Sequence, residues 1–260
     1  MDNILELIVE RFSAISQIEA ITLGGSQAEG ASDDKSDYDI YVYSTSPVSK
    51  KLRESFISEL CTYADIDVHD LEPVDYCIFA SGEQVDIIYR TIDEYVNNLN
   101  RVVKKYAASL GFTTCLWHNL LHCKILFDRS GRYGEIKNKF SVPYPDELRV
   151  NIIDRNMARL TSTVHAYEDQ IIKAARRGDL VNLNIRAAGL MASYFDIIFA
   201  YNSITNPGEK KLVEYCRANC ERLPENFEEN ISSLLQNMFA KPELIYTDLH
   251  NLIAELEKMI

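Results

Sequence analysis

The sequence is poor in basic residues for its size. Its 260 residues include 27 Lys and Arg against 39 Asp and Glu, which gives a formal net charge of −12 and a pI near 4.9. Proteins that bind nucleic acid usually present a basic face that neutralises phosphates, and the one dense basic run here is residues 173–177. The composition therefore disfavours nucleic acid as a partner. An acidic surface would attract cationic small molecules, although acidic totals also serve solubility.

Long apolar runs and secretion signals are missing as well. No stretch approaches the roughly 20 uncharged apolar residues of a membrane helix, and residues 1–6 lack the basic-then-apolar pattern of a signal peptide. We therefore expect a cytoplasmic protein that does not enter a membrane. The 47% of hydrophobic and 25% of charged residues are typical of a folded globular chain.

The cysteines have no framework spacing, and several lie in apolar runs, so we interpret them as reduced. They are Cys61, Cys77, Cys115, Cys123, Cys216 and Cys220. Cys115, His118, His122 and Cys123 would fall near one face of a helix, and zinc accepts such ligands. Their spacing matches no common zinc module, and the apolar neighbours favour the alternative, a buried helix with two hydrogen-bonded histidines.

The first 90 residues alternate between helical and strand patterns. Apolar residues recur at helical spacing over residues 3–17 and 50–60. Strands are predicted at residues 18–23, 37–43, 64–68, 74–79 and 84–89. The last two flank Ser81-Gly82-Glu83, a tight-turn signal, and so predict a hairpin.

From Thr91 onward the pattern becomes helical and stays so. Pro143-Tyr144-Pro145 interrupts it. Five further helices are predicted after this point, at residues 146–177, 179–201, 207–219, 224–239 and 242–259. The predicted fold class is α+β, with a mixed β-sheet flanked by helices over residues 1–143 and an all-α helical bundle over residues 144–260.

One predicted strand breaks into a glycine turn at Gly24-Gly25-Ser26. Glycine removes the side chain where the backbone must turn sharply and approach a ligand. Backbone N–H groups at the start of the following helix, with the Ser26 hydroxyl, could cradle a polyphosphate, because a helix N-terminus carries unpaired donors and partial positive charge. A glycine pair on its own most often marks only a turn.

Aspartates on two predicted strands complete a candidate site. Residues i and i+2 of a strand point to the same side, so Asp37 and Asp39 project together. Adjacent carboxylates repel unless a cation or proton compensates them, and such oxygen ligands suit Mg²⁺. Asp86 stands in an apolar run, where an unpaired charge is costly, and we expect it to face the same cations. The alternatives are a solvated edge strand for the pair and a capped or salt-bridged role for Asp86.

A second Asp-x-Asp, Asp65 and Asp67, competes with the first. It follows a predicted helix and lacks a glycine-serine turn before it. We therefore place it at a strand end or in a loop and keep it as a minor competitor, with Asp75 near a strand start.

These residues resemble a known family. Gly24-Gly25-Ser26, Asp37-x-Asp39 and Asp86 are similar to the motifs of the nucleotidyltransferase superfamily, which includes DNA polymerase beta and the aminoglycoside and lincosamide nucleotidyltransferases. Residues 126–131 and 206–210 resemble, more loosely, bacterial nucleotidyltransferase-like proteins with a helical C-terminal domain. The resemblance implies that residues 1–143 form a nucleotidyltransferase-type catalytic domain.

The resemblance also implies cofactors and roles. In this superfamily two Mg²⁺ ions bridge a carboxylate triad and the triphosphate of a nucleotide. Asp37 and Asp39 would ligate both metals, whereas Asp86 would ligate one metal and accept the proton of the substrate hydroxyl.

Phosphate contacts are implied at the turn and at three cations. Gly24, Gly25 and Ser26 would hold the nucleotide phosphates. Lys173, Arg177 and Lys210 are further candidates for phosphate contact, although exposed cations on helical bundles are usually only solvated.

The implied activity is transfer of a nucleoside monophosphate, from ATP or another nucleoside triphosphate, to a hydroxyl of a small molecule, with release of pyrophosphate. An aminoglycoside or lincosamide antibiotic is the specific candidate acceptor. The alternatives are nucleotidylation of a protein or an RNA end, and a non-catalytic nucleotide-binding relative. Dimers are common among the antibiotic enzymes of this superfamily, so the resemblance points to a homodimer.

Overall fold

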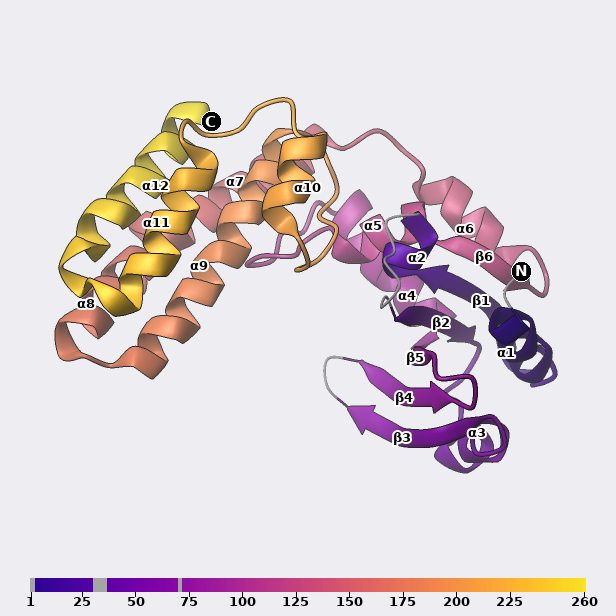
Figure 1. Ribbon diagram of the computed structural model, residues 1–260. Coiled ribbons are helices and arrows are strands. Elements are labelled where there is room, and N and C mark those ends of the chain that lie inside the picture. The colour runs from indigo at the N-terminus through magenta and orange to yellow at the C-terminus, as the bar shows by residue number, and fades with distance from the viewer. Residues whose placement is uncertain (1–2, 30–36, 70–71) are drawn as a thin grey trace. The chain divides into compact units, whose positions relative to one another are not determined.

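The computed structural model describes residues 3–29, 37–69 and 72–260, without the side chains of Asn3, Ser26 and Glu29. The chain forms two compact units (Figure 1). We call Met1–Asn100 with Asn119–Val142 the sheet unit, and Arg101–His118 with Pro143–Ile260 the helical unit. The domain division at residues 143 and 144 stays a prediction, and this grouping leads us to propose that residues 101–118 belong with the helical domain.

The sheet unit contains six described strands in the order β3-β4-β5-β2-β1-β6. Only the central pair, β2 with β5, is parallel among the described strand pairs. The predicted α+β class is confirmed. The strands are β1 (Ile18–Gly24), β2 (Tyr38–Ser44), β3 (Cys61–His69), β4 (Pro73–Phe79), β5 (Gln84–Thr91) and β6 (Lys124–Asp128).

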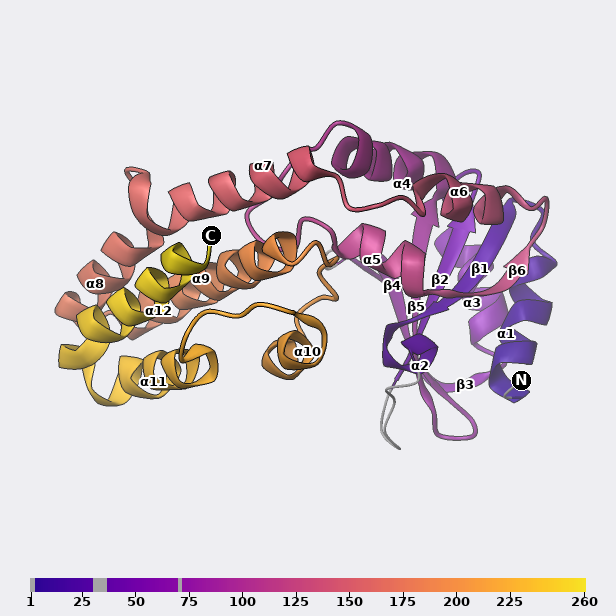
Figure 2. The same ribbon diagram turned by 90° about the horizontal axis from the view of Figure 1, so that it is seen from above.

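Helices cover both faces of this sheet (Figure 2). On one face, α1 (Asn3–Ser13) and α3 (Lys50–Ile57) enclose a core that includes Ile21, Ile40 and Ile87, all fully buried. Full burial of one such side chain stabilises the fold by about 1.5–3 kcal/mol. These apolar side chains therefore fix the sheet that carries the candidate site.

The opposite face holds the alternate residues of the same strands. There Tyr43 lies against Tyr95 of α4 (Ile92–Leu99) and Tyr133 of α6 (Arg132–Phe140), with ring centroids 4.8 and 4.7 Å apart. A π-helical turn, Asn100–Lys104, follows α4. Asp39 and Asp86 belong to this second face, away from the core under α1 and α3.

Two expectations about strands are wrong. Helices alone were expected after Thr91, yet β6 pairs antiparallel with β1 and closes that side of the sheet. Its centre, residues 125–127, is continuously apolar, so the strand shows no period-2 alternation. The second error concerns β3, which runs through both Asp65 and Asp67, so this pair does not lie at a strand end or in a loop. A register irregularity between Asp65 and Val68, with a φ of +72° at Asp67, marks a bulge.

The helical unit is centred on α9, against which α7 and α8 pack, while α11 pairs with α12. One long helix over residues 146–177 is a wrong prediction, because the chain becomes extended at Thr163. Residues 161–164 are three β-branched residues and a serine, all weak helix formers, which disfavours helix there. The helices are α7 (Asp146–Met157), α8 (Tyr167–Arg177), α9 (Leu180–Tyr201), α10 (Leu212–Asn219), α11 (Phe227–Ala240) and α12 (Ile245–Met259), with a π turn at Ala158–Ser162 and a 3₁₀ turn at Pro242–Leu244.

Helix α9 is apolar enough to need comment. Among the helices that the structure describes, it alone has the length and composition to cross a membrane, and 61% of its most apolar window is buried inside the protein. The Asp179 side chain caps its start by accepting from the Asn182 N–H. Burial of this kind is what the core helix of a bundle shows.

Candidate active site

The glycine turn lies where β1 ends and the short helix α2 (Gly25–Glu29) begins. Gly25 has a φ of +62°, a left-handed conformation that residues with a Cβ rarely adopt. A Cβ at this position would lie 1.9 Å from Asp39 Oδ2. The Asp39 carboxylate therefore rests against the backbone of the turn, and glycine is required there for both conformation and space.

Strands β2 and β5 bring two carboxylates side by side. The parallel register pairs Asp39 with Asp86, and neighbouring strands lie about 4.8 Å apart, so the two side chains leave the same face at that spacing. Both residues are half-buried. Like charges this close repel, and a cation between them relieves the repulsion. The structure thus brings Asp39 and Asp86 together, while their metal-binding and catalytic roles stay predictions.

Asp37 lies outside the strands, unlike Asp39 and Asp86. It directly precedes β2 and is half-buried. Within residues 3–29, 37–69 and 72–260, no three His, Cys, Asp or Glu side chains gather closely enough to hold a metal ion. Magnesium is usually held by one or two carboxylates plus substrate phosphates. The donor set of Asp39 and Asp86 therefore fits a Mg²⁺–nucleotide complex better than a bare ion.

The other predicted phosphate contacts are not tested by this geometry. The Ser26 side chain lies outside the described residues. Lys210 belongs to the helical unit, where it is exposed in an irregular segment, since α10 begins at Leu212 and not at residue 207 as predicted. Lys173 and Arg177 are exposed on α8. Their contacts with phosphate stay predictions.

The Cys-His cluster is divided between the two units, since the boundary falls after His118 within α5 (Cys115–His122). His118 is buried, with Nδ1 2.8 Å from Thr205 Oγ1. His122 is exposed at the helix end. The expected hydrogen bond is therefore found for His118, and the expected burial of the helix does not extend to His122. Cys123 is buried in the sheet unit.

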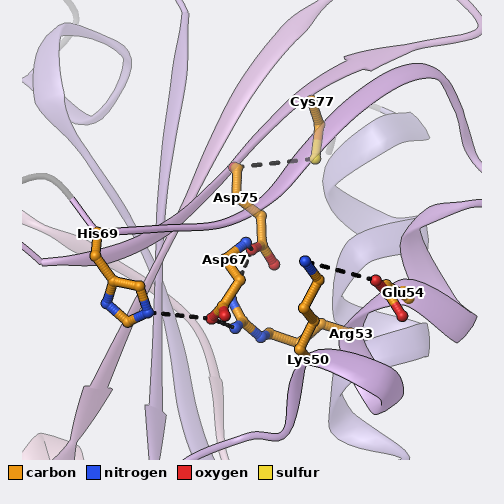
Figure 3. A network of polar contacts seen from close by, with 7 residues as sticks. All are labelled: Lys50, Arg53, Glu54, Asp67, His69, Asp75 and Cys77. Carbon is orange, nitrogen blue, oxygen red and sulfur yellow. Dashed lines mark hydrogen bonds and ion pairs between the residues drawn. The ribbon is translucent and has the colours of Figure 1, made fainter.

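Asp67, the second acid of the other Asp-x-Asp, belongs to an ion-pair network between α3 and the strands β3 and β4 (Figure 3). Arg53 of α3, only 3% exposed, donates from Nη1 to Asp75 Oδ1 at 2.6 Å and from Nη2 to Asp67. The Asp67 N–H also donates to Asp75 Oδ1, at 2.8 Å. The Arg53 hydrogen bond holds the pKa of the Asp67 carboxyl below its usual range. A protein cation therefore already compensates these acids.

Arg90 on β5 is a buried cation that the sequence analysis missed. Its Nε and Nη2 donate to the two carboxylate oxygens of Glu72, at 2.8 and 2.6 Å. Its guanidinium carbon lies 4.4 Å from the centre of the Tyr41 ring. The signal was present, because a charge inside an apolar strand is as informative at Arg90 as at Asp86.

Two family models match the chain. Residues 4–104 match a model described as a nucleotidyltransferase domain. Residues 113–211 match a domain of unknown function, DUF4037. No curated protein matches the chain significantly.

Several solved structures match the chain at low sequence identity and low TM-score. A nucleotidyltransferase-like protein from Exiguobacterium sibiricum 255-15 is 11% identical, over 98% of this chain and 72% of its own, with a TM-score of 0.46. An aminoglycoside 6-adenyltransferase from Bacillus subtilis is 11% identical, over 98% and 89%, with a TM-score of 0.28. Spectinomycin adenyltransferase AAD(9) from Enterococcus faecialis, solved with ATP and spectinomycin, is 12% identical, over 97% and 98%, with a TM-score of 0.34.

The family model spans strands β1 to β5 and includes the glycine turn with all three predicted aspartates. The resemblance inferred from Gly24-Gly25-Ser26, Asp37-x-Asp39 and Asp86 is therefore confirmed at the level of the family. Residues 4–104 thus match the nucleotidyltransferase-domain family, and this match supports a transferase of the nucleotidyltransferase class.

Proposed function

We propose that the protein transfers a nucleoside monophosphate from ATP, or from another nucleoside triphosphate, to a hydroxyl of a small molecule and releases pyrophosphate. The observation that carries this proposal is the register of Asp39 with Asp86 beside the Gly25 turn. Two carboxylates next to a backbone bend without side chains suit a Mg²⁺–triphosphate complex, because carboxylates and phosphates together ligate Mg²⁺ and free N–H groups bind phosphate.

The proposed step is an in-line displacement at phosphorus. The acceptor hydroxyl oxygen attacks the α-phosphorus, and the bond from that phosphorus to the oxygen bridging the α- and β-phosphates breaks. Asp86 accepts the hydroxyl proton, and pyrophosphate leaves with the electron pair of the broken bond. A positioned general base contributes about 10²–10⁴-fold to such a rate.

Asp37, Asp39 and Asp86 would hold two Mg²⁺ ions, whose charge stabilises the attacking and departing oxygens of the displacement. The backbone N–H of Gly25 and the Ser26 hydroxyl would hold the β- and γ-phosphates. Lys210 is proposed as a further phosphate contact.

The net charge of the chain supports a cationic acceptor. At −12 the protein attracts amines and repels polyanions, which favours an aminoglycoside or lincosamide antibiotic over an RNA end. We also propose a cytoplasmic homodimer, following the antibiotic enzymes that the motifs resemble.

The test is pyrophosphate release from Mg²⁺–ATP in the presence of an antibiotic panel. Release that depends on one antibiotic supports the proposal. Release only with a protein or RNA acceptor supports nucleotidylation of a macromolecule instead. Binding of Mg²⁺–nucleotide in isothermal titration, without release against any acceptor, supports a non-catalytic relative.

A further inference from the structure

We propose that Arg90 is a positioning residue that fixes the glycine turn of the nucleotide site by way of Tyr41 and Asn119. This inference rests on the proposed function, because it assumes that the turn receives the β- and γ-phosphates. Arg90 itself is placed too deeply to be a phosphate ligand, since its side chain is 10% exposed and is held by Glu72.

Alternation along the strands places Arg90 on the face that carries the carboxylates. Asp86 and Arg90 are four residues apart on β5, and Asp39 and Tyr41 are two apart on β2, so all four side chains leave the same side of the sheet. The Arg90 guanidinium covers the Tyr41 ring at 4.4 Å. A cation over an aromatic face is attracted by the ring quadrupole, and burial strengthens the attraction.

The side chains of Tyr41 and Asn119 both pack closely against Gly24 of the turn. A Cβ at Gly24 would lie 2.6 Å from Tyr41 Cε2 and 2.8 Å from Asn119 Nδ2. Arg90 contacts both supports, because its Nη1 also donates to Asn119 Oδ1 at 3.5 Å. The guanidinium thus lies behind the two side chains that set the position of Gly24, and the next residue, Gly25, receives the Asp39 carboxylate.

The geometry uses features that only arginine has. Nε and Nη2 form a two-pronged contact with Glu72, and the flat face covers Tyr41. Nη1 donates both to the Tyr43 hydroxyl, at 3.3 Å, and to Asn119 Oδ1, at 3.5 Å. Lysine carries the same charge as a single point on a flexible stem and cannot make all of these contacts. Arg90→Lys therefore keeps the charge and removes the positioning.

The experiment compares the affinities of the full-length protein for Mg²⁺–ATP and for AMP. We expect Arg90→Lys to raise the Kd for ATP about tenfold, because small displacements of positioning groups have effects of this size or larger. The Kd for AMP should stay within about twofold, since AMP has no β- or γ-phosphate to meet the turn. A general loss of stability would not separate the two nucleotides.

Glu72→Gln is a milder variant that leaves Arg90 in place. It should raise the Kd for ATP about threefold, because a neutral acceptor makes weaker hydrogen bonds than a charged one. It decides the question if thermal melting shows that Arg90→Lys does not fold. Arg132→Lys is the matched control, since Arg132 is an arginine of the same unit paired with Asp93 at 2.5 Å on the surface, and it should change neither affinity.

Unchanged ATP affinity in folded Arg90→Lys, or equal loss of ATP and AMP affinity, would overturn this inference while leaving the proposed function intact. If the unaltered protein binds no nucleoside triphosphate at all, the proposed function and this inference fall together.

Discussion

The two Asp-x-Asp segments of the sheet share a spacing and differ in surroundings. The first, ending at Asp39, begins β2 in the middle of the sheet and lies beside Gly25 and in register with Asp86. The second, ending at Asp67, lies on the edge strand β3 and is held by Arg53. Spacing alone therefore does not set the chemistry of two carboxylates. The groups beside each pair differ, because Asp67 has a buried cation as its partner and Asp39 lies against the Gly25 backbone.

Removing a carboxylate of the first segment has the largest expected effect. We expect Asp37→Asn and Asp39→Asn each to abolish nucleotidyl transfer while the fold persists, a loss of about 10³-fold or more, because metal-assisted charge stabilisation is worth several kcal/mol. Pyrophosphate release measures the loss, and circular dichroism checks the fold. Asp65→Asn, an exposed acid of the second segment, is the control and should keep full activity. Normal turnover in Asp39→Asn would contradict the assignment.

Breaking the ion-pair network of the second segment should lower the stability of the fold and leave the catalytic activity unchanged. Arg53→Met leaves the fully buried Asp75 without its cation, and loss of one partner of a buried pair costs about 3–5 kcal/mol of unfolding free energy. Urea denaturation measures this change. Arg11→Met, which removes the exposed pair with Glu59, is the control and should cost about 0–1 kcal/mol. Equal losses of unfolding free energy in the two variants would show that burial does not set the contribution of the ion pair.

The turn beside the first segment should tolerate no side chain. Gly25→Ala puts a methyl group against the Asp39 carboxylate, and we expect nucleotide affinity to fall about 10–100-fold as the turn shifts. Gly82→Ala is the matched control. Gly82 has a φ of +100° and no atom within 4 Å of an added Cβ, so it should lose about 1 kcal/mol of stability through backbone strain and no affinity. The same loss of affinity in both variants would mean that strain, not the contact with Asp39, is responsible.

Acid should weaken the second segment by a predictable route. Arg53 lowers the pKa of Asp67 in the folded chain, so the pair stabilises the fold above the usual Asp pKa of about 3.9, and this contribution is lost as the pH falls through the lowered value. Asp67→Asn should therefore be less stable than the unaltered protein near neutral pH, with the gap closing in acid. Urea denaturation from about pH 7 down to pH 3 measures the gap. A gap that stays constant across that range would exclude this linkage.

Local sequence pattern was enough to predict the separate elements of the candidate site. It was not enough to predict which of their residues lie side by side. Glycine at the turn, the strand after it and the hairpin of β4 and β5 each follow from a few neighbouring residues. The pairing of Asp39 with Asp86 joins residues 47 positions apart, and no periodicity encodes such a register. That expectation came from the family resemblance and from the cost of burying an isolated charge.

The misses have physical causes as well. Five residues of β6 show no period, so only a neighbour in space reveals it as a strand. At the bulge, Asp67 pairs with Arg53, which α3 brings in from another part of the chain, so no pattern local to Asp67 predicts that contact. Arg90 was missed because the rule that singled out Asp86, a charge in an apolar strand, was applied to acids alone.

The pairing of β6 with β1 has a practical consequence for shortening the protein. A chain cut at residue 104, where the nucleotidyltransferase-domain match ends, would lack β6 and leave β1 as an unpaired edge strand. Unpaired edge strands pair with strands of other molecules, so such a fragment should aggregate or associate. A soluble minimal catalytic piece needs the chain as far as α6, well past the border that family comparison would suggest.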